Sequence, residues 1–157
     1  MKTEDLIKII NSTKKKNFGK INNATKVFQS IRIFVNEEIS QLINGLINAY
    51  NLLPKGGIIA VISFHSIEDK IVKFFFKEFS QHKNLSRYYP EAKKNENKFK
   101  ILNKKPIIPG QDEIKANPPS RSAKLRCAVK VGTNSDFISF KNKFNYLIEI
   151  ENLSKKL

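Results

Sequence analysis

A short polar stretch from Ser63 to Asp69 follows directly on a run of apolar residues that begins at Ile58. Ser63, His65 and Asp69 carry the hydroxyl, imidazole and carboxylate of a hydrolytic triad, but no nucleophile-elbow or oxyanion sequence surrounds them, which disfavours a hydrolase. The chain has only two histidines and one cysteine, so no metal site is expected. If the strand runs through Ser63 and His65, both side chains point to one side at its carboxyl end, where open α/β sheets bind ligands. The alternative is that they only satisfy backbone groups at a strand-to-helix turn.

A second set of candidate residues is basic and follows the Asn117-Pro118-Pro119 turn. Arginine matches the geometry of a phosphate group, and on a strand alternate residues share one face, so these side chains are predicted to contact the phosphates of a nucleic acid. The alternative is an ordinary half-exposed strand whose arginines pair with carboxylates. Arg32, within a long helical pattern, has the same two interpretations. The candidate RNA-binding residues are therefore Arg32, Arg121, Ser122, Lys124 and Arg126.

The stretch 56–79 contains the elements that must position the first set of side chains. Residues 58–64 are apolar apart from Ser63, which predicts a parallel strand buried on both faces. Ser66 is expected to cap the following helix, with Glu68 and Asp69 in its first turn, where the helix dipole favours negative charge. The buried face of this helix is predicted to consist of Ile67, Ile71, Phe74, Phe75 and Phe79.

Other elements are predicted on both sides of this stretch. They are a short helix from Thr3, a helical pattern over 24–53 with a bend or fresh start at 36–38, a basic loop near 80–105, a short edge strand at 104–110, one or two helical turns at 111–116 and a strand at 123–131. Residues 133–157 fit a strand or a helix equally well.

The bulk composition narrows the class of partner. The net charge of +15 and the pI near 9.9 favour a polyanionic partner, nucleic acid before membrane, although a lysine-rich composition from an AT-rich genome would look the same. A single cysteine excludes an internal disulfide and fits a reducing compartment. No apolar run approaches the roughly 18 residues of a membrane span, and the N-terminus lacks a secretory signal. A cytoplasmic protein is expected.

Three blocks of the sequence resemble those of a known family. Residues 23–36 resemble HPATRTFQALRIxVN, residues 63–73 resemble SFHSLEDRIVK, and residues 106–126 resemble KPIxPSxxEIxxNPRARSAKLR. In this order and spacing the blocks are similar to the MraW/RsmH family of 16S ribosomal RNA (cytosine-N4)-methyltransferases. The resemblance covers about Thr3 to Val131.

The resemblance implies an α/β fold, namely the C-terminal portion of a Rossmann-like class I methyltransferase with part of an inserted helical region. Its implied segments are 1–53 (insert and return helix), 54–132 (the C-terminal part of the sheet with the basic loop) and 133–157 (a C-terminal extension). The implied function is S-adenosylmethionine-dependent N4-methylation of a cytidine in small-subunit ribosomal RNA. Ser63 and His65 would then hydrogen-bond the cytosine edge or help to position the cofactor half.

The chain resembles only the C-terminal part of the family. Nothing in it matches the family's cofactor motifs, because Gly56-Gly57 precedes a strand instead of following one, so no residue of this chain is assigned to S-adenosylmethionine. Asn22-Asn23 also replaces the family's usual His-Pro. A missing N-terminal methyltransferase half is therefore an expected partner beside the ribosomal RNA. The alternative function is a non-catalytic RNA-binding or partner-binding module, or one half of a split enzyme.

Overall fold

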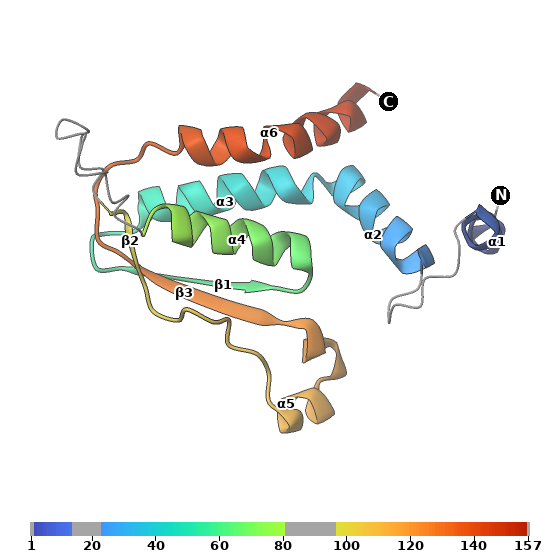
Figure 1. Cartoon of the computed structure of the whole chain (residues 1–157), viewed down its shortest axis with the longest axis horizontal. Coiled ribbons are helices and arrows are strands. Elements are labelled where there is room, and N and C mark those ends of the chain that lie inside the picture. Colours follow the sequence, from blue (N-terminus) through green and yellow to red (C-terminus); the bar gives the residue numbers. More distant parts are fainter. Residues whose placement is uncertain (1, 14–22, 81–96, 157) are drawn as a thin grey trace, which may run out of the picture. The chain divides into compact units, whose positions relative to one another are not determined.

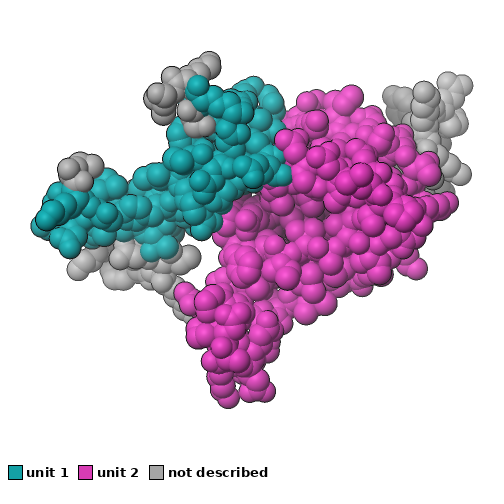
Figure 2. Space-filling view, turned by 180° about the vertical axis from the view of Figure 1, so that it is seen from behind, with its two compact units in different colours: residues 1–41, 145–157 teal, residues 42–144 magenta. Residues whose placement is uncertain are grey.

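The computed structural model describes residues 2–13, 23–80 and 97–156, and it divides into two compact units. Unit 1 consists of residues 1–41 and 145–157, and unit 2 of residues 42–144 (Figure 2). The segments expected from the sequence, with boundaries at residues 53 and 132, follow chain order, whereas the units are defined by contacts. Those boundaries stay a prediction. The greater part of the predicted basic loop lies outside the described residues.

Unit 1 is helical. It contains α1 (Thr3–Thr13), α2 (Asn23–Asn36), the start of α3 (Glu38–Leu52), the end of α6 (Ile138–Asn152) and the 3-10 turn η2 (Leu153–Lys156). The expected interruption of the long helical pattern at 36–38 is confirmed. Its cause is Glu37, which adopts the left-handed region with a φ of 51°, a conformation that cannot continue a right-handed helix.

A buried carboxylate satisfies the start of helix α3 in unit 1. Glu151, only 2% exposed, accepts hydrogen bonds from the backbone amides of Ile39 and Ser40, each at 2.8 Å, and from the Ser40 hydroxyl at 2.5 Å. The first amides of a helix have no partner within the helix, and the helix dipole favours a negative charge there. The C-terminal segment of the chain therefore caps a helix that begins more than a hundred residues earlier.

Unit 2 is built on a three-stranded antiparallel sheet of order β1-β3-β2 (Figure 1). The strands are β1 (Ile58–Ser63), β2 (Phe99–Ile101) and β3 (Lys124–Lys130), with Ala60 opposite Cys127 and Ile101 opposite Ala128. The strand predicted at 123–131 and the helical turn at 111–116, now α5 (Gln111–Ala116), are confirmed. The edge strand predicted at 104–110 reduces to one bridge between Ile107 and Leu125. The 3-10 turn η1 (Pro118–Ser122) leads into β3.

The prediction of a parallel β1 buried on both faces is wrong for the described residues. β1 pairs only with β3, and its partner runs antiparallel. Ile59 and Ser63 are buried, but Ile58, Ile62 and Phe64 on the opposite face are 57%, 59% and 56% exposed. The reason is that no described segment covers this second face or pairs with the outer edge of β1. The apolar residues expected on both faces of the strand are present, but within the described residues only the face with Ile59 and Ser63 is buried.

Helix α4 (Ser66–Glu78) lies along one face of the sheet (Figure 1). A cluster of aromatic rings packs around this helix. Phe75 is fully buried and its ring centroid lies 4.8 Å from that of Phe140 and 5.1 Å from that of Phe99. Edge-on and tilted ring pairs at such distances stabilise a core beyond the effect of burial alone. Ile67, predicted to be buried, is 38% exposed, because it lies in the first turn of α4, about two helical turns before the aromatic residues begin at Phe74.

A buried lysine closes the C-terminal end of helix α3 within unit 2. The Lys130 ammonium donates to the carbonyl oxygens of Tyr50, at 2.8 Å, and Leu53, at 2.7 Å, and lies 4.3 Å from the Tyr50 ring centroid. A cation at the carboxyl end of a helix satisfies free carbonyls and complements the dipole. Residues 138–152 form α6, which settles the tail segment as helix instead of strand. No helix in the described ranges has the length and apolar character needed to cross a bilayer.

Candidate functional site at the end of strand β1

The turn between β1 and α4 is organised by His65 instead of Ser66. His65 is the N-cap residue: its Nδ1 accepts the amide of Glu68 at 3.3 Å, while the Glu68 carboxylate accepts the amides of His65 at 3.2 Å and Phe64 at 2.9 Å. This reciprocal arrangement is a capping box. The prediction that Ser66 caps the helix is therefore wrong, because the extended backbone of His65 (φ −134°, ψ 163°) makes it the last residue before the helical turn.

The His65 imidazole is oriented by the same carboxylate. Because Nδ1 accepts a hydrogen bond, the ring proton of the neutral form sits on Nε2, which lies 3.3 Å from Glu68 Oε1. The side chain is only 11% exposed. This arrangement supports the interpretation that His65 satisfies local backbone groups. Nε2 is buried within the described residues, and the predicted substrate contact stays a prediction.

A buried charge cluster lies beside this turn and joins α4 to β3. Arg126 binds the Asp69 carboxylate with Nε at 2.8 Å and Nη2 at 3.3 Å, and Lys124 Nζ lies 3.5 Å from the same carboxylate. Burial of the Asp69 carboxyl, the largest single effect, opposes its ionisation. The hydrogen bonds and positive charges of Arg126 and Lys124 together outweigh that effect and hold the pKa of Asp69 below its usual value.

Strand register places Ser63 next to this cluster. Ser63 is opposite Lys124, is 3% exposed, and its hydroxyl lies 3.5 Å from the Lys124 carbonyl oxygen, a long contact. The structure therefore brings together Ser63, His65, Lys124 and Arg126 at one end of the sheet. Of these, Lys124 is half-exposed, whereas Arg126 is 7% exposed and committed to Asp69, which supports the ion-pair alternative for Arg126.

The remaining predicted RNA contacts differ in their accessibility. Arg121 and Ser122 are exposed on η1, at the end of β3 that adjoins the same turn. Within the described residues, the hydrogen bond of the Arg121 side chain is a long one, of 3.5 Å, to the Pro118 carbonyl. Arg32 belongs to unit 1, where it binds Glu38 with Nε at 2.8 Å and Nη2 at 3.1 Å. Of the three predicted arginines, exposed Arg121 is thus the best placed for a phosphate, and Arg32 is engaged in an ion pair.

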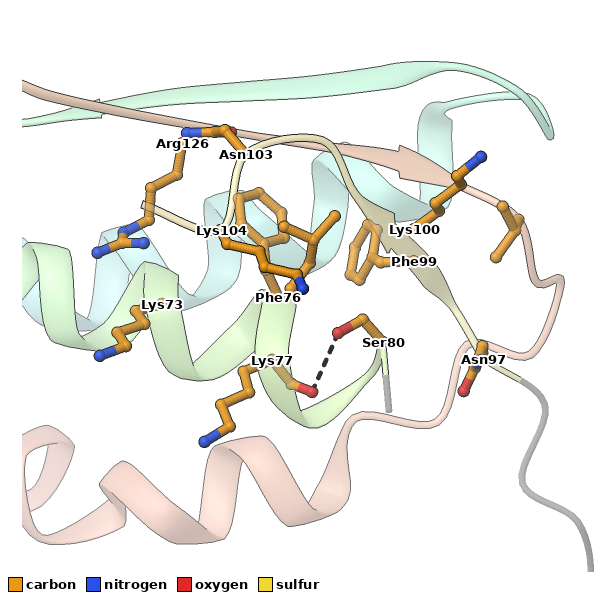
Figure 3. Close-up of a pocket in the computed structure, with 12 residues that line it drawn as sticks. Lys73, Phe76, Lys77, Ser80, Asn97, Phe99, Lys100, Asn103, Lys104 and Arg126 are labelled. Carbon is orange, nitrogen blue, oxygen red and sulfur yellow. Dashed lines mark hydrogen bonds between the residues drawn. The ribbon is translucent and has the colours of Figure 1, made fainter. Parts of the chain in front are cut away.

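A cavity that the sequence reasoning missed opens beyond this cluster. It has a volume of about 710 Å³ and lies in unit 2 between the C-terminal half of α4 and the chain around β2, with Arg126 in its wall (Figure 3). Lys73 and Lys77 line it from α4, and Lys104 lines it from the segment after β2. The four-residue spacing of Lys73 and Lys77 was the available signal, since such residues share one face of a helix.

Comparison with known proteins gives consistent matches. A model of the MraW methylase family matches residues 1–131. The chain is 50% identical over 113 residues to the ribosomal RNA small subunit methyltransferase H of Persephonella marina, a match that covers 72% of this chain and 34% of that protein. It is 44% identical over 126 residues to the protein of that name from Nitrobacter winogradskyi, covering 80% and 38%. For Brachyspira hyodysenteriae the identity is 45% over 121 residues, covering 77% and 37%. The chain thus matches little more than a third of the length of these curated relatives.

Proposed function

The chain belongs to the MraW methylase family, and from this premise we propose that it forms the substrate-facing part of a ribosomal RNA methyltransferase. The complete enzyme would use S-adenosylmethionine to methylate N4 of a cytidine in small-subunit ribosomal RNA. This chain would form the C-terminal portion of a Rossmann-like class I methyltransferase fold, and the complete enzyme would act in the cytoplasm. The similar proteins named ribosomal RNA small subunit methyltransferase H support the class of substrate.

One observation carries the proposal: the turn that holds His65 lies next to an open sheet edge. Along β1, the outer edge has no strand partner and one apolar face has no cover among the described residues. Ligands of open α/β sheets bind outside the carboxyl ends of their strands. Additional strands joined to this edge would bring their own carboxyl ends beside the His65 turn. The greater length of the relatives is a source of such strands.

The described residues do not fit S-adenosylmethionine. Its usual cradle is a glycine-rich loop after a strand, at a helix N-terminus. Here Gly56, with a φ of 89°, and Gly57 precede β1, and a Cβ at Gly57 would lie 2.6 Å from the Leu53 side chain. These glycines serve a tight turn. We therefore propose that the cofactor is held by polypeptide other than these 157 residues, and that this chain acts on the RNA.

The chemistry proposed for this chain is positioning. The lone pair of the cytosine amino group is delocalised into the ring, so the base must be held out of its helix and at a fixed angle. His65, oriented by Glu68, and Ser63 beside it would bond the base edge. Arg121 and half-exposed Lys124 would bind the adjoining phosphates.

The test is complementation. The chain alone, and the chain fused behind the N-terminal portion of the Persephonella marina relative, would be expressed in a bacterial strain that lacks its own enzyme. N4-methylcytidine in small-subunit ribosomal RNA would be measured by mass spectrometry. We expect the modification with the fusion and none with the chain alone. Modification by the chain alone would overturn the placement of the cofactor. A fusion that folds and binds the cofactor without modifying RNA would overturn the function and favour the non-catalytic binding module.

Two substitutions of His65 separate its capping role from a substrate contact. His65→Ala removes the cap and is expected to cost about 1 kcal/mol of unfolding free energy. Asparagine is among the best N-cap residues, so His65→Asn is expected to retain stability. If His65 also binds the base, the fusion with His65→Asn should lose at least tenfold of its methylation rate at an unchanged unfolding midpoint. An unchanged rate would leave His65 with its capping role alone.

A further inference from the structure

The cavity beside β2 combines positive charge with an apolar wall. Lys73, Lys77 and Lys104 contribute charged groups, and none of the three forms an ion pair with a carboxylate within the part of the chain that the structure describes. Lys100 also lines the cavity, but Figure 3 shows its ammonium directed away from it. The guanidinium of Arg126 is already matched by Asp69. The lysines therefore leave an uncompensated positive charge that favours an anionic ligand.

Apart from Ser80, Asn97 and Asn103, the remaining wall of the cavity is apolar, and it is large enough to hold a ring. Phe76 and Phe99 lie edge to face with their centroids 5.2 Å apart, and Ile101 and Val131 continue this surface. A volume of about 710 Å³ falls in the range of pockets that hold small organic ligands. A simple inorganic anion would leave the apolar wall without a partner. A ligand with a planar, largely apolar ring next to phosphate groups matches both features.

The cavity is separate from the His65 turn. Helix α4 begins at Ser66, and its lysines Lys73 and Lys77 follow seven and eleven residues later. At about 1.5 Å per residue these positions lie roughly 10–17 Å farther along the helix. The cavity and the turn therefore lie along one helix, at a distance that a few nucleotides of single-stranded RNA can span.

We propose that this cavity binds one unstacked nucleotide of single-stranded RNA. The base would pack against Phe76, Ile101 and Val131, and the adjoining phosphates would lie at the lysines. Single-stranded nucleic acids are held in this manner, by basic grooves with apolar or aromatic surfaces for the bases. The inference rests on the proposed function to the extent that both require RNA. It adds a binding site apart from the one that receives the reacting cytidine.

The first test is direct binding by the full 157-residue chain without cofactor. The probe is a fluorescein-labelled RNA hexanucleotide, measured by fluorescence anisotropy over a range of salt concentrations. The double variant Lys73→Glu/Lys77→Glu should bind at least tenfold more weakly. The slope of the logarithm of the binding constant against the logarithm of the salt concentration should also become shallower by about 1.4, which is roughly 0.7 for each of two phosphate contacts. The control Lys26→Glu/Lys55→Glu changes the net charge equally at two exposed positions outside the cavity. Equal losses in both variants would overturn the proposal.

The second test asks whether a base enters the cavity. The wild-type chain should prefer the hexanucleotide to an abasic hexamer with the same phosphates by about fivefold or more. Ser80→Phe introduces an uncharged ring at the cavity wall, at a half-buried residue just after α4. It should abolish this preference and leave the affinity for the abasic hexamer unchanged. No preference in the wild type, or the same preference in Ser80→Phe, would show that only phosphates bind.

Two further outcomes separate this inference from binding of free nucleotides and from the proposed function. Free cytidine monophosphate should compete only at concentrations far above the dissociation constant of the hexanucleotide; competition at equal concentration would assign the cavity to free nucleotides instead. Because binding is measured without methylation, a fusion that fails to modify RNA leaves this test intact. Conversely, loss of the cavity contact does not by itself abolish the proposed reaction.

Discussion

Replacing Asp69 with asparagine tests the buried cluster that joins α4 to β3. The substitution keeps the shape of the side chain but removes the charge that Arg126 contacts at 2.8 and 3.3 Å. Breaking one partner of a buried pair costs about 3–5 kcal/mol. Asparagine retains an acceptor for Arg126, and half-exposed Lys124 admits solvent to the cluster, so we expect a smaller loss of about 2 kcal/mol in unfolding free energy. For a chain of this size that is a fall of about 6 °C in the melting temperature.

The loss should depend on pH in a defined direction. The pKa of Asp69 in the folded chain is lowered from an ordinary value of 3.8, so its carboxylate stabilises the fold only where it is ionised. That contribution is fully present above the pKa of the unfolded chain and disappears as the pH falls through the lower pKa of the folded chain. The difference in unfolding free energy between wild type and Asp69→Asn should therefore be largest at pH 7. It should be almost as large at pH 5 and should shrink below about pH 4.

Urea unfolding followed by circular dichroism at several pH values gives the required measurement. Asp112→Asn is the matched control, because Asp112 is fully exposed on α5, and its midpoint should equal that of the wild type. A difference for Asp69→Asn that is the same at pH 7 and at pH 2.5 would refute the ion-pair explanation. So would a difference below about 0.5 kcal/mol at pH 7, which is the usual effect of a surface substitution.

Three further substitutions test other contacts by urea unfolding. Glu151→Gln weakens the cap of α3 and should cost about 1–2 kcal/mol, whereas Glu149→Gln, at an exposed position on the same helix, should cost nothing measurable; equal effects would contradict the capping role. Lys130→Met removes two charged hydrogen bonds and should cost about 2–3 kcal/mol, and Lys55→Met should be neutral; a stable Lys130→Met would show that the carbonyls find other partners. Glu37→Gly relieves the φ of 51° but also removes the ion pair with Lys155, so its reference is Glu37→Gln, which removes the charge and keeps the backbone angle; relative to Glu37→Gln it should be more stable by about 0.5–1 kcal/mol, and a loss instead would contradict stored strain.

Local patterns in the sequence were sufficient for most individual elements. The alternation at 123–131 predicted β3, the apolar run from Ile58 predicted β1, and the polar residues at 36–38 predicted the break between α2 and α3. The three sequence blocks were sufficient for the family. These signals share a physical basis, because periodicity and turn chemistry act between residues that are close in sequence.

The N-cap and the tail depended on more than local pattern. Ser66 and His65 are neighbours that both offer a cap, and His65 takes this role because its backbone is extended, so that it is the last residue before the helical turn. By local pattern alone, residues 133–157 fit a strand or a helix equally well. In the structure residues 138–152 form a helix, and Phe137 and Phe140 pack into the aromatic cluster of unit 2.

The candidate sites were decided by tertiary structure. Arg126 and Asp69 are 57 residues apart, and only the register of β3 against β1 places the arginine under α4. The same register buries Lys130 beneath the end of α3, and folding carries Lys104 to the cavity that Lys73 also lines. Sequence by itself determined which residue types were available and which elements would carry them. Which charges are neutralised and which still face a cavity depends on long-range contacts, because an ion pair is defined by distance in space and not by separation along the chain.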